Sequence, residues 1–342
     1  MRPKVSIIMP VLNGEKYIGE AIRSIVAQSY SNYELVVIDD GSTDGTKQQL
    51  DSFAGQLEIK YVHHPAPKGI PASMNDGLRH ASGDLIAFLD HDDAWFPEFL
   101  ETQVTYLQEH PDVGMVHSDI QTIDGEGNVI EASVAVCRKH IPPSGNIFPQ
   151  LFMQSLICGN SVLIRKNCFQ HLGHFDENLH FGDYHMWMRI ARHYRIDYVG
   201  KVLTKYRQHQ TQSTRTLPVD RPNEDSAGIV AVKKIIELYP QIWEELGKKR
   251  VRRRLALLYF DMAYSAYLQG LFHNARICVA KAIRLWRTRP RYYLFYATTF
   301  LLPSHVSMLR AAMRRLRTFF SFGESGIDWT RPMQRTIDRK KQ

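Results

Sequence analysis

The chain reads Val36-Val37-Ile38-Asp39-Asp40-Gly41-Ser42-Thr43-Asp44, an apolar run of strand length that stops at acidic and turn-forming residues. A second apolar run ends at Leu89 and leads directly into Asp90-His91-Asp92-Asp93. Open α/β sheets place ligand-binding acids at the carboxyl ends of buried strands, and crowded carboxylates call for a cation or a polar ligand. Two ordinary acidic turns are the alternative. The recurrence of the pattern favours a site for metal and phosphate.

The same reading predicts an α/β fold. Apolar runs predict strands at residues 5–9, 34–39, 58–63, 85–89 and 113–118. Helices are predicted between them, starting near Ile18, near Thr43 or Asp44, and near Pro71. Strands that alternate with helices predict a mainly parallel sheet with right-handed connections, whose ligands gather at its carboxyl edge.

Charge divides the 342 residues into two parts. Residues 221–342 contain 24 Lys and Arg against 9 Asp and Glu, and they lack strand alternation. We therefore predict a catalytic α/β domain over 1–220, a basic helical domain over 221–322 and a polar basic tail over 323–342, with the first boundary near Pro218–Pro222.

Cysteine usage and the chain's opening favour the cytoplasm. The four cysteines form no CxxC pair, which argues against a disulfide scaffold or a structural zinc site. Met1-Arg2-Pro3-Lys4 leads into a strand-like run rather than a secretory signal. The apolar stretch 292–302 is too short to span a bilayer, so no transmembrane helix is expected.

Five segments together resemble the ordered motifs of glycosyltransferase family 2. They are Pro10-Val11-Leu12-Asn13, Gln28-Ser29-Tyr30 with Tyr33-Glu34, Asp39 to Asp44, Ala81-Ser82-Gly83-Asp84, and Leu89 to Asp93. The resemblance covers about residues 3–215. It implies the GT-A fold, a Rossmann-like, mainly parallel sheet flanked by helices, and inverting transfer of a sugar from a nucleotide-diphosphate donor with Mn²⁺ or Mg²⁺. A UDP-sugar is the first expectation for the donor, with guanosine or thymidine as other bases.

The resemblance also implies roles for single residues. Asp183, in Phe181-Gly182-Asp183-Tyr184, would be the catalytic base, and Asp92 would bind the metal. In a Tyr-Arg-x-His segment, Arg207 would contact phosphate, and His209 would bind the metal or phosphate. The remaining nucleotide-sugar contacts would be Pro10, Val11, Leu12, Asp39, Asp40, Lys68 and Asp90, with Asp40 on the base, and Gly159, Asn160 and Trp187 would line the sugar or acceptor pocket.

Plain structural roles remain open for several of these residues. Asp183 could cap a helix whose core includes Trp187, residues 159–161 could form a simple turn, and His209 could be structural. The chain also departs from the family pattern at Gly182, His185 and Met74. A nucleotide-sugar-binding scaffold or regulator without strong activity is therefore the alternative to an enzyme of polysaccharide or glycolipid synthesis in the cell envelope.

The basic part contains one helical hairpin resembling a tetratricopeptide unit, with small residues at packing positions. These positions are Tyr259, Ala263, Ala266, Gly270, Ala275, Val279 and Ala282. Its charge has three readings: contact with an anionic membrane surface near a glycan or lipid-linked acceptor, solvated helix faces, or nucleic-acid binding, which is the least favoured because no recognition module accompanies it.

Overall fold

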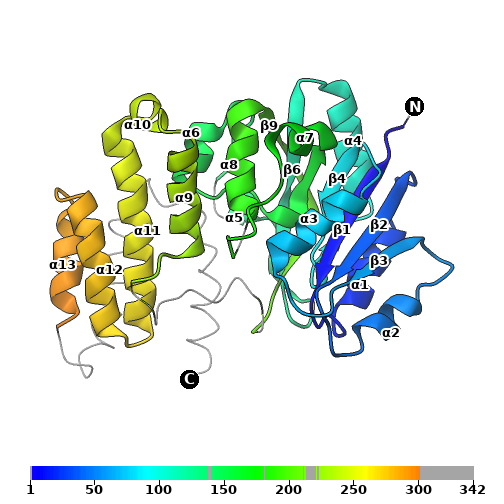
Figure 1. The fold of residues 1–342 in the computed structure, drawn as a ribbon, viewed down its shortest axis with the longest axis horizontal. Coiled ribbons are helices and arrows are strands. Elements are labelled where there is room, and N and C mark those ends of the chain that lie inside the picture. Colours follow the sequence, from blue (N-terminus) through cyan, green and yellow to red (C-terminus); the bar gives the residue numbers. More distant parts are fainter. Residues whose placement is uncertain are drawn as a thin grey trace. The chain divides into compact units, whose positions relative to one another are not determined.

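The computed structural model describes residues 2–300 except 138–139, 181, 211, 213–220 and 222. Its contacts divide the chain into two compact units, Met1–Pro149 with Ile157–Arg215, and Gln150–Leu156 with Thr216–Gln342 (Figure 1). Most of the predicted boundary at 218–222 and the tail 323–342 lie outside the described residues, as does the basic segment after residue 300.

The first unit is built on one sheet with the strand order β3-β2-β1-β4-β8-β6-β9-β5, and β7 pairs with β6. The strands β1 to β4 pair in parallel. The sheet becomes mixed beyond β4, because β8 runs antiparallel to both β4 and β6. The strands are β1 Val5–Val11, β2 Tyr33–Asp39, β3 Ile59–His63, β4 Leu85–Phe88, β5 Ala94–Trp95, β6 Val113–Asp124, β7 Val129–Glu131, β8 Val162–Arg165 and β9 Arg195–Gln208.

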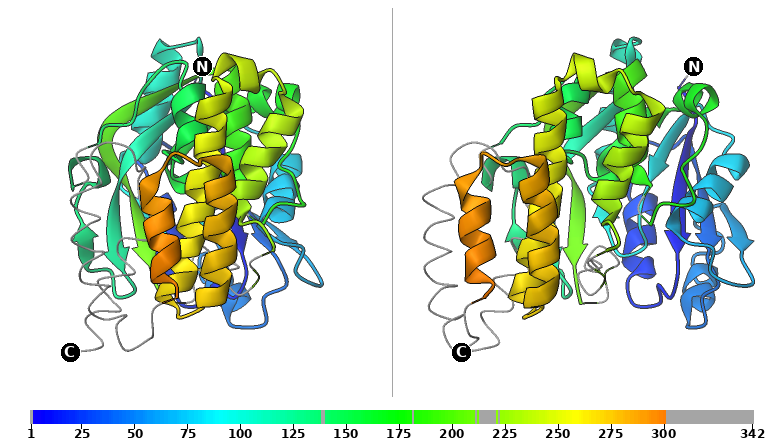
Figure 2. Two further views of the ribbon diagram at one scale, coloured as in Figure 1. Left: turned by 90° about the vertical axis from the view of Figure 1, so that its left-hand side faces the viewer. Right: turned by 60° about the vertical axis from the view of Figure 1, so that its left-hand side comes forward.

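Helices cover both faces of this sheet (Figure 2). Ile7 belongs to the core shared with α1 and α4. Ile8 points to the opposite face and lies against α3, where a Cβ at Gly77 would be 2.2 Å from its Cγ2, so only glycine fits. The helices of this unit are α1 Ile18–Val26, α2 Thr46–Asp51, α3 Ile70–His80, α4 Phe99–Glu109, α5 Val134–Cys137, α7 Lys166–Leu172 and α8 Asp183–His193, with a 3₁₀ turn, η1, at Gly159–Ser161. The short helix α6, Phe148–Met153, has most of its residues in the second unit.

The five predicted strands and the three predicted helices are present. Strand β6 continues to Asp124, beyond its predicted end at residue 118, and the other predicted strand ends are shifted by two residues at most. The short strands β5 and β7 and the long strand β9 were not predicted. Strand β9 is half polar along its length and exposed at its middle, so it lacks the apolar run on which the prediction depended.

The second unit is helical among its described residues. Its helices after residue 220 are α9 Ala227–Leu238, α10 Ile242–Glu245, α11 Lys248–Leu268, α12 Phe272–Leu285 and α13 Pro290–Thr298. The predicted hairpin is formed by α11 and α12, and six of its seven marker residues are buried in one apolar cluster. The seventh, Gly270, has φ +82° in the connecting turn. No helix in the described part of the chain has the length and apolar character to cross a membrane.

Candidate active site

Two acidic segments meet at one edge of the sheet. Strands β2 and β4 both pair in parallel with β1, so their carboxyl ends point the same way. Asp39 is the last residue of β2, and Asp90 follows β4 after one intervening residue. This is the edge at which open α/β sheets bind ligands.

Three carboxylates crowd together after β4. One oxygen from each of Asp90, Asp92 and Asp93 lies within 4.8 Å of the others. His209 joins them, since its Nε2 atom lies 2.8 Å from Oδ2 of Asp92. Carboxylate oxygens with one imidazole suit Mn²⁺ or Mg²⁺. The cluster therefore has the chemistry of a divalent-cation site, with the two predicted metal ligands side by side.

The pKa values of these three acids are shifted in different directions. Burial, the charge of Asp92 and that of Asp183 raise the pKa of Asp90 to about 7. Burial and the charges of Asp92 and Asp90 raise the pKa of Asp93 well above its usual range. Burial would also raise the pKa of Asp92, but hydrogen bonding to His209 and the nearby His91 outweigh it and lower the pKa. A bound cation would relieve this repulsion.

Asn160 holds the acidic cluster in shape. Its amide nitrogen donates to Oδ2 of Asp90 at 3.0 Å and to Asp93, and its amide oxygen accepts from the Asp90 backbone N–H at 3.0 Å. Its own carbonyl accepts from the indole N–H of Trp95 at 2.7 Å. Asn160 is 3 % exposed, so it organises the acids rather than lining an open pocket as predicted.

Asp183 lies beside this cluster at the start of α8. It is the first helical residue and Gly182 is the N-cap, so the helix-cap alternative is wrong. Its Oδ1 accepts from the Tyr184 backbone N–H at 2.7 Å, and burial raises its pKa. A Cβ placed on Gly159 would sit 3.5 Å from its Oδ2, so Gly159 faces the carboxylate. A carboxylate with a raised pKa is suited to accept a proton.

The carboxylates of Asp39 and Asp40 accept hydrogen bonds from donors within the protein. Asp39 accepts from the Ser42 backbone N–H at 2.8 Å and from the Tyr61 hydroxyl at 2.6 Å. Asp40 is 5 % exposed and accepts from the backbone N–H groups of Lys68 and Gly69, both at 2.8 Å. These two acids therefore hold the loops of this edge, and a direct contact of Asp40 with a nucleotide base stays a prediction.

His64 completes the support of Asp40 and was not singled out from the sequence. Its Nδ1 lies 2.7 Å from Oδ1 of Asp40 and its Nε2 lies 2.6 Å from Oδ2 of Asp76 on α3. The ring is 3 % exposed. Its place after β3, at the same carboxyl edge as the acids, is the signal that could have found it.

Four further predicted nucleotide contacts, Pro10, Val11, Leu12 and Lys68, differ in their exposure. Pro10 and Val11 are buried in the sheet, and the Val11 carbonyl accepts from the Asp40 backbone N–H at 2.8 Å. Leu12 is 42 % exposed. Lys68 is half exposed, with its Nζ 3.6 Å from Asp76. Leu12 and Lys68 are thus the residues of this group that a ligand can reach.

Two predicted ligand contacts are corrected by burial. The Arg207 side chain is enclosed: its guanidinium donates to the Asp92 carbonyl at 2.8 Å and to Glu20 at 2.5 Å, and it lies over the Tyr17 ring. Arg207 therefore fastens the acidic loop and does not face a phosphate. Trp187 is fully buried among Phe88 and Phe175. The family resemblance implied a pocket-lining role for Trp187, and the helix-core role that was left open is the one observed.

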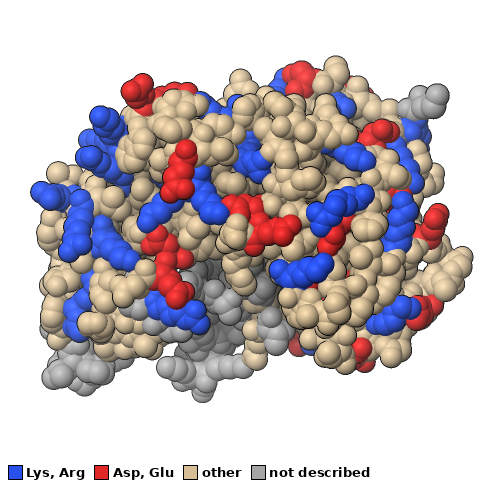
Figure 3. Space-filling view, viewed as in Figure 1, with Lys and Arg blue, Asp and Glu red and all other residues tan. Residues whose placement is uncertain are grey.

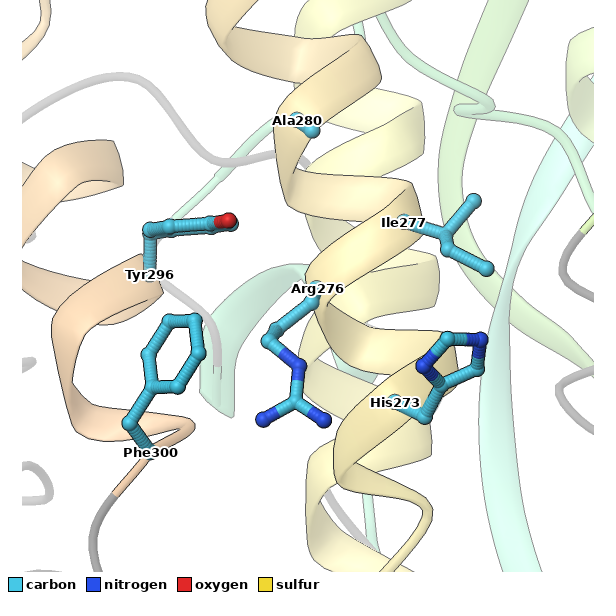
Figure 4. A pocket seen from close by; sticks show the side chains of 6 residues that line it. All are labelled: His273, Arg276, Ile277, Ala280, Tyr296 and Phe300. Atoms are coloured by element: carbon cyan, nitrogen blue, oxygen red, sulfur yellow. The ribbon is translucent and has the colours of Figure 1, made fainter.

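The second unit contains an open groove between α12 and α13 (Figure 4). Its Arg276 lies over the Phe300 ring at 4.6 Å and donates to the Thr299 carbonyl at 3.2 Å. The lining residues include no carboxylate and no nucleophile beyond a histidine and a tyrosine: His273, Arg276, Ile277, Ala280, Tyr296 and Phe300. The groove therefore does not compete with the acidic cluster as an active site.

Comparisons with known proteins identify the family of this chain. The family model described as glycosyl transferase family 2 matches residues 6–189. An uncharacterized glycosyltransferase of Rickettsia prowazekii, RP339, is 30% identical over 262 residues, which are 75% of each chain. The Escherichia coli protein WfgD, named UDP-Glc:alpha-D-GlcNAc-diphosphoundecaprenol beta-1,3-glucosyltransferase, is 29% identical over 76% of this chain and 91% of its own.

Solved structures share the fold at low sequence identity. S. aureus TarS 1-349, in complex with UDP-GlcNAc, has a TM-score of 0.55 and 18% identity over 85% of this chain and 91% of its own. Mannosyltransferase PcManGT from Pyrobaculum calidifontis, in complex with GDP-Man and Mn²⁺, has a TM-score of 0.55 and 19% identity over 93% of this chain and 81% of its own. With the family model matching more than half of its length, this chain belongs to glycosyltransferase family 2 and has the GT-A fold.

Proposed function

We propose that this glycosyltransferase is an inverting, metal-assisted enzyme that moves a sugar from a nucleoside-diphosphate donor to an acceptor hydroxyl. One observation carries the proposal. Asp183, whose pKa is raised by burial, faces Gly159. The next residue, Asn160, donates to Asp90 and Asp93 of the crowded cluster that also contains Asp92. A proton acceptor and a cation site then flank one reaction space.

The donor set fits a divalent metal. Asp92, His209 and Asp90 would hold Mn²⁺ or Mg²⁺, since their ligand atoms are oxygens and one imidazole nitrogen. The raised pKa of Asp90 shows that repulsion between the carboxylates persists despite their hydrogen bonds. When bound, the cation would supply Lewis-acid stabilisation of the charge on the departing diphosphate.

The chain's own residues account for the rest of the transfer. Asp183 takes the proton of the acceptor hydroxyl as its oxygen bonds to the anomeric carbon, while the bond from that carbon to the diphosphate oxygen breaks. Attack from the face opposite the leaving group inverts the anomeric configuration. Asn160 and Arg207 keep Asp90, Asp92 and Asp93 in place during the step.

The donor and acceptor classes follow from relatives and remain proposals. A UDP-sugar is favoured, because the name of WfgD specifies UDP-Glc and TarS was solved with UDP-GlcNAc, although PcManGT was solved with GDP-Man. A glycan or lipid-linked acceptor is favoured by the diphosphoundecaprenol acceptor in the name of WfgD. The basic helical unit supports action at the cytoplasmic face of an anionic membrane, in polysaccharide or glycolipid synthesis.

An inactive scaffold is the second candidate, and three departures from the family pattern motivated it. The structure supports the enzyme instead, because Met74 and His185 are buried, with 6 % and 5 % exposure. Gly182 is enclosed too, since a Cβ there would meet Pro71 and Phe175 at 3.4 Å. Substitutions at buried packing positions leave the acids of the site intact.

The test compares Asp183→Asn with the wild type. We expect the variant to bind UDP and Mn²⁺ as before while metal-dependent release of UDP from the preferred UDP-sugar falls at least about 100-fold. Asp112→Asn is the matched control, since its carboxylate is 62% exposed and pairs with Arg195, whose side chain is also exposed. Full activity of Asp183→Asn would refute the base assignment, and donor binding without release by the wild type would favour the scaffold.

A further inference from the structure

Tyr17 brings together the start of α1 and the segment after β9. Its ring centre lies 5.1 Å from that of His209, and the Arg207 guanidinium lies over the same ring at 4.8 Å. A Cβ placed on Gly125, in the turn after β6, would lie 3.3 Å from the Tyr17 hydroxyl oxygen and 3.7 Å from Cβ of His209. Three segments that are distant in the sequence therefore meet around one aromatic ring.

The backbone of Tyr17 is held at the entry to α1. Its N–H donates to the Gly14 carbonyl at 3.0 Å, and its own carbonyl accepts from the N–H of Glu20 at 2.8 Å. Gly14 in turn lies against His91 of the acidic loop, because a Cβ there would be 2.8 Å from Cδ2 of the histidine ring. The apolar side chains of α1 are buried in the core beneath the sheet. Tyr17 therefore has a fixed place relative to the loop that carries Asp92.

Arg207 fixes the plane of the Tyr17 ring. Its guanidinium donates to the Asp92 carbonyl at 2.8 Å and to Glu20 at 2.5 Å, and its side chain is 2% exposed. A guanidinium anchored by both partners offers a fixed cationic face on which an aromatic ring packs. The Tyr17 ring cannot turn away from His209 without losing this contact.

His209 meets the Tyr17 ring at the point where strand pairing has ended. The last pair between β6 and β9 joins Asp124 to Gln208, so His209 lies just beyond it. Nε2 of its ring lies 2.8 Å from Oδ2 of Asp92, and the ring itself packs against Tyr17 at an angle of 43°. A histidine ligand binds a metal ion well only when neighbouring groups hold its ring in the right direction, and Tyr17 is one such neighbour.

We propose that Tyr17 is a positioning residue, which holds the imidazole of His209 in the orientation that binds the divalent cation. The inference rests on the proposed function, because it concerns the metal site of that transfer. The aromatic ring, and not the hydroxyl, makes the contacts with Arg207 and His209. Phenylalanine should therefore replace this tyrosine, whereas a residue without an aromatic ring should not.

The test measures the Mn²⁺ affinity of the full chain by calorimetric titration. Tyr17→Ala should weaken binding by about tenfold, and Tyr17→Phe should stay within about threefold of the wild type. Tyr194→Ala is the matched control, because it removes a half-buried tyrosine whose ring packs on another histidine, His171, at 5.9 Å. Its affinity should stay within about twofold of the wild type, since Tyr194 is at the opposite end of α8 from Asp183. Equal losses in Tyr17→Ala and Tyr194→Ala would overturn the proposal.

A double-mutant cycle with His209→Ala shows whether Tyr17 acts through the histidine. The double variant should bind Mn²⁺ as His209→Ala alone does, within about twofold. Losses that multiply would mean that Tyr17 acts on another part of the protein, and they would overturn its role. If Tyr17→Ala does not fold, Tyr17→Leu keeps an apolar side chain of similar length without the ring, and wild-type affinity in that variant would equally refute the role.

The outcomes separate this inference from the proposed function. Wild-type binding that His209→Ala weakens and Tyr17→Ala leaves unchanged would refute the role of Tyr17 and keep the metal site. Absence of Mn²⁺ binding by the wild type would refute both, whereas Tyr17-dependent binding without sugar transfer would keep the inference and refute the transfer. Helices α12 and α13 offer no competing cation site, since neither contains Asp or Glu, and Figure 3 shows Lys and Arg side chains over them.

Discussion

Nε2 of His209 lies 2.8 Å from Oδ2 of Asp92, although 117 positions separate the two residues in the chain. The pairing of β5 with β9 explains the contact, because Ala94 is aligned with Lys205 and Trp95 with Thr204. The residues just before β5 and just after β9 are thereby brought together. A short strand of two residues thus assembles the pair that we propose as metal ligands.

His209→Ala should weaken Mn²⁺ binding by about 10- to 100-fold, since it removes either a ligand or the group that orients Asp92. Calorimetric titration with Mn²⁺ measures the affinity. His171→Ala, which removes an exposed imidazole bonded to Tyr194, is the control and should leave the affinity unchanged. An unaltered affinity in His209→Ala would remove this histidine from the metal site.

Mn²⁺ affinity should rise with pH up to about pH 7 and then level off. The pKa of Asp90 is raised to about 7 by burial and by the charge of Asp92, and a protonated carboxyl must lose its proton to bind the ion. The affinity should therefore change by up to about tenfold per pH unit below that point. Asp90→Asn should flatten the profile, and a wild-type profile that is flat between about pH 5.5 and 7 would contradict the assignment.

The same shift makes a prediction for stability without metal. The folded pKa of Asp90 lies above its unfolded value, so its contribution to the free energy of unfolding is present at low pH and is lost as pH rises from about 4 to about 7. Added Mn²⁺ should restore the melting temperature above pH 7, where the carboxylate is free to bind.

The sequence was sufficient to predict the acids at the strand ends and the helical hairpin, because these depend on local patterns. Asp90 and Asp92 follow an apolar run directly, and the small residues of α11 and α12 recur at helical spacing. Such patterns depend only on the residues within one segment. They carry no information on which distant segments pack against it in the fold.

The roles of Arg207 and Asn160 could not be predicted this way. Arg207 is turned inward by Glu20, which is 187 positions away, and Asn160 is 70 positions from Asp90. From the sequence alone, a polar side chain near a predicted site is interpreted as a ligand contact, because its partners within the protein are unknown. In the structure, Arg207 donates to the Asp92 carbonyl and Asn160 donates to the carboxylates of Asp90 and Asp93, so both side chains hold the acidic cluster.

His64→Phe should lower both the stability of the protein and its affinity for UDP. The change leaves the buried carboxylate of Asp40 and the partly buried carboxylate of Asp76 without their shared partner, which should lower the free energy of unfolding by roughly 3 kcal/mol. UDP affinity should fall as well, because Asp40 fixes the backbone at Lys68 and Gly69. Urea denaturation and UDP titration measure the two effects.

The neighbouring His63 provides the matched control for that change. Its ring is 48% exposed and lies 3.6 Å from Asp39. His63→Ala should therefore change the unfolding free energy by less than about 1 kcal/mol. Equal effects of the two substitutions would show that the bridge between Asp40 and Asp76 contributes nothing specific.

Glu34→Gln should lower the free energy of unfolding and leave the rate of sugar transfer unchanged. Glu34 is at the amino end of β2, opposite to Asp39, and accepts from Nζ of Lys4 at 2.8 Å, from Nζ of Lys60 at 2.7 Å and from Ser6 and Ser82. Burial alone would raise its pKa, but these donors together hold the pKa well below the usual range. Loss of the charge should cost about 2 kcal/mol, because the two lysines stay partly hydrated.

The pH dependence and a surface control make this prediction specific. With a depressed folded pKa, the contribution of Glu34 is present above about pH 4 and is lost on acidification, so the wild type and Glu34→Gln should converge in stability at low pH. Glu101→Gln, which breaks an exposed pair with Arg2, should change stability by less than about 1 kcal/mol. Because Glu34 is at the edge away from Asp90 and Asp183, kcat of Glu34→Gln at a temperature where it stays folded should equal that of the wild type; a fall in kcat would mean that the two edges of the sheet are coupled.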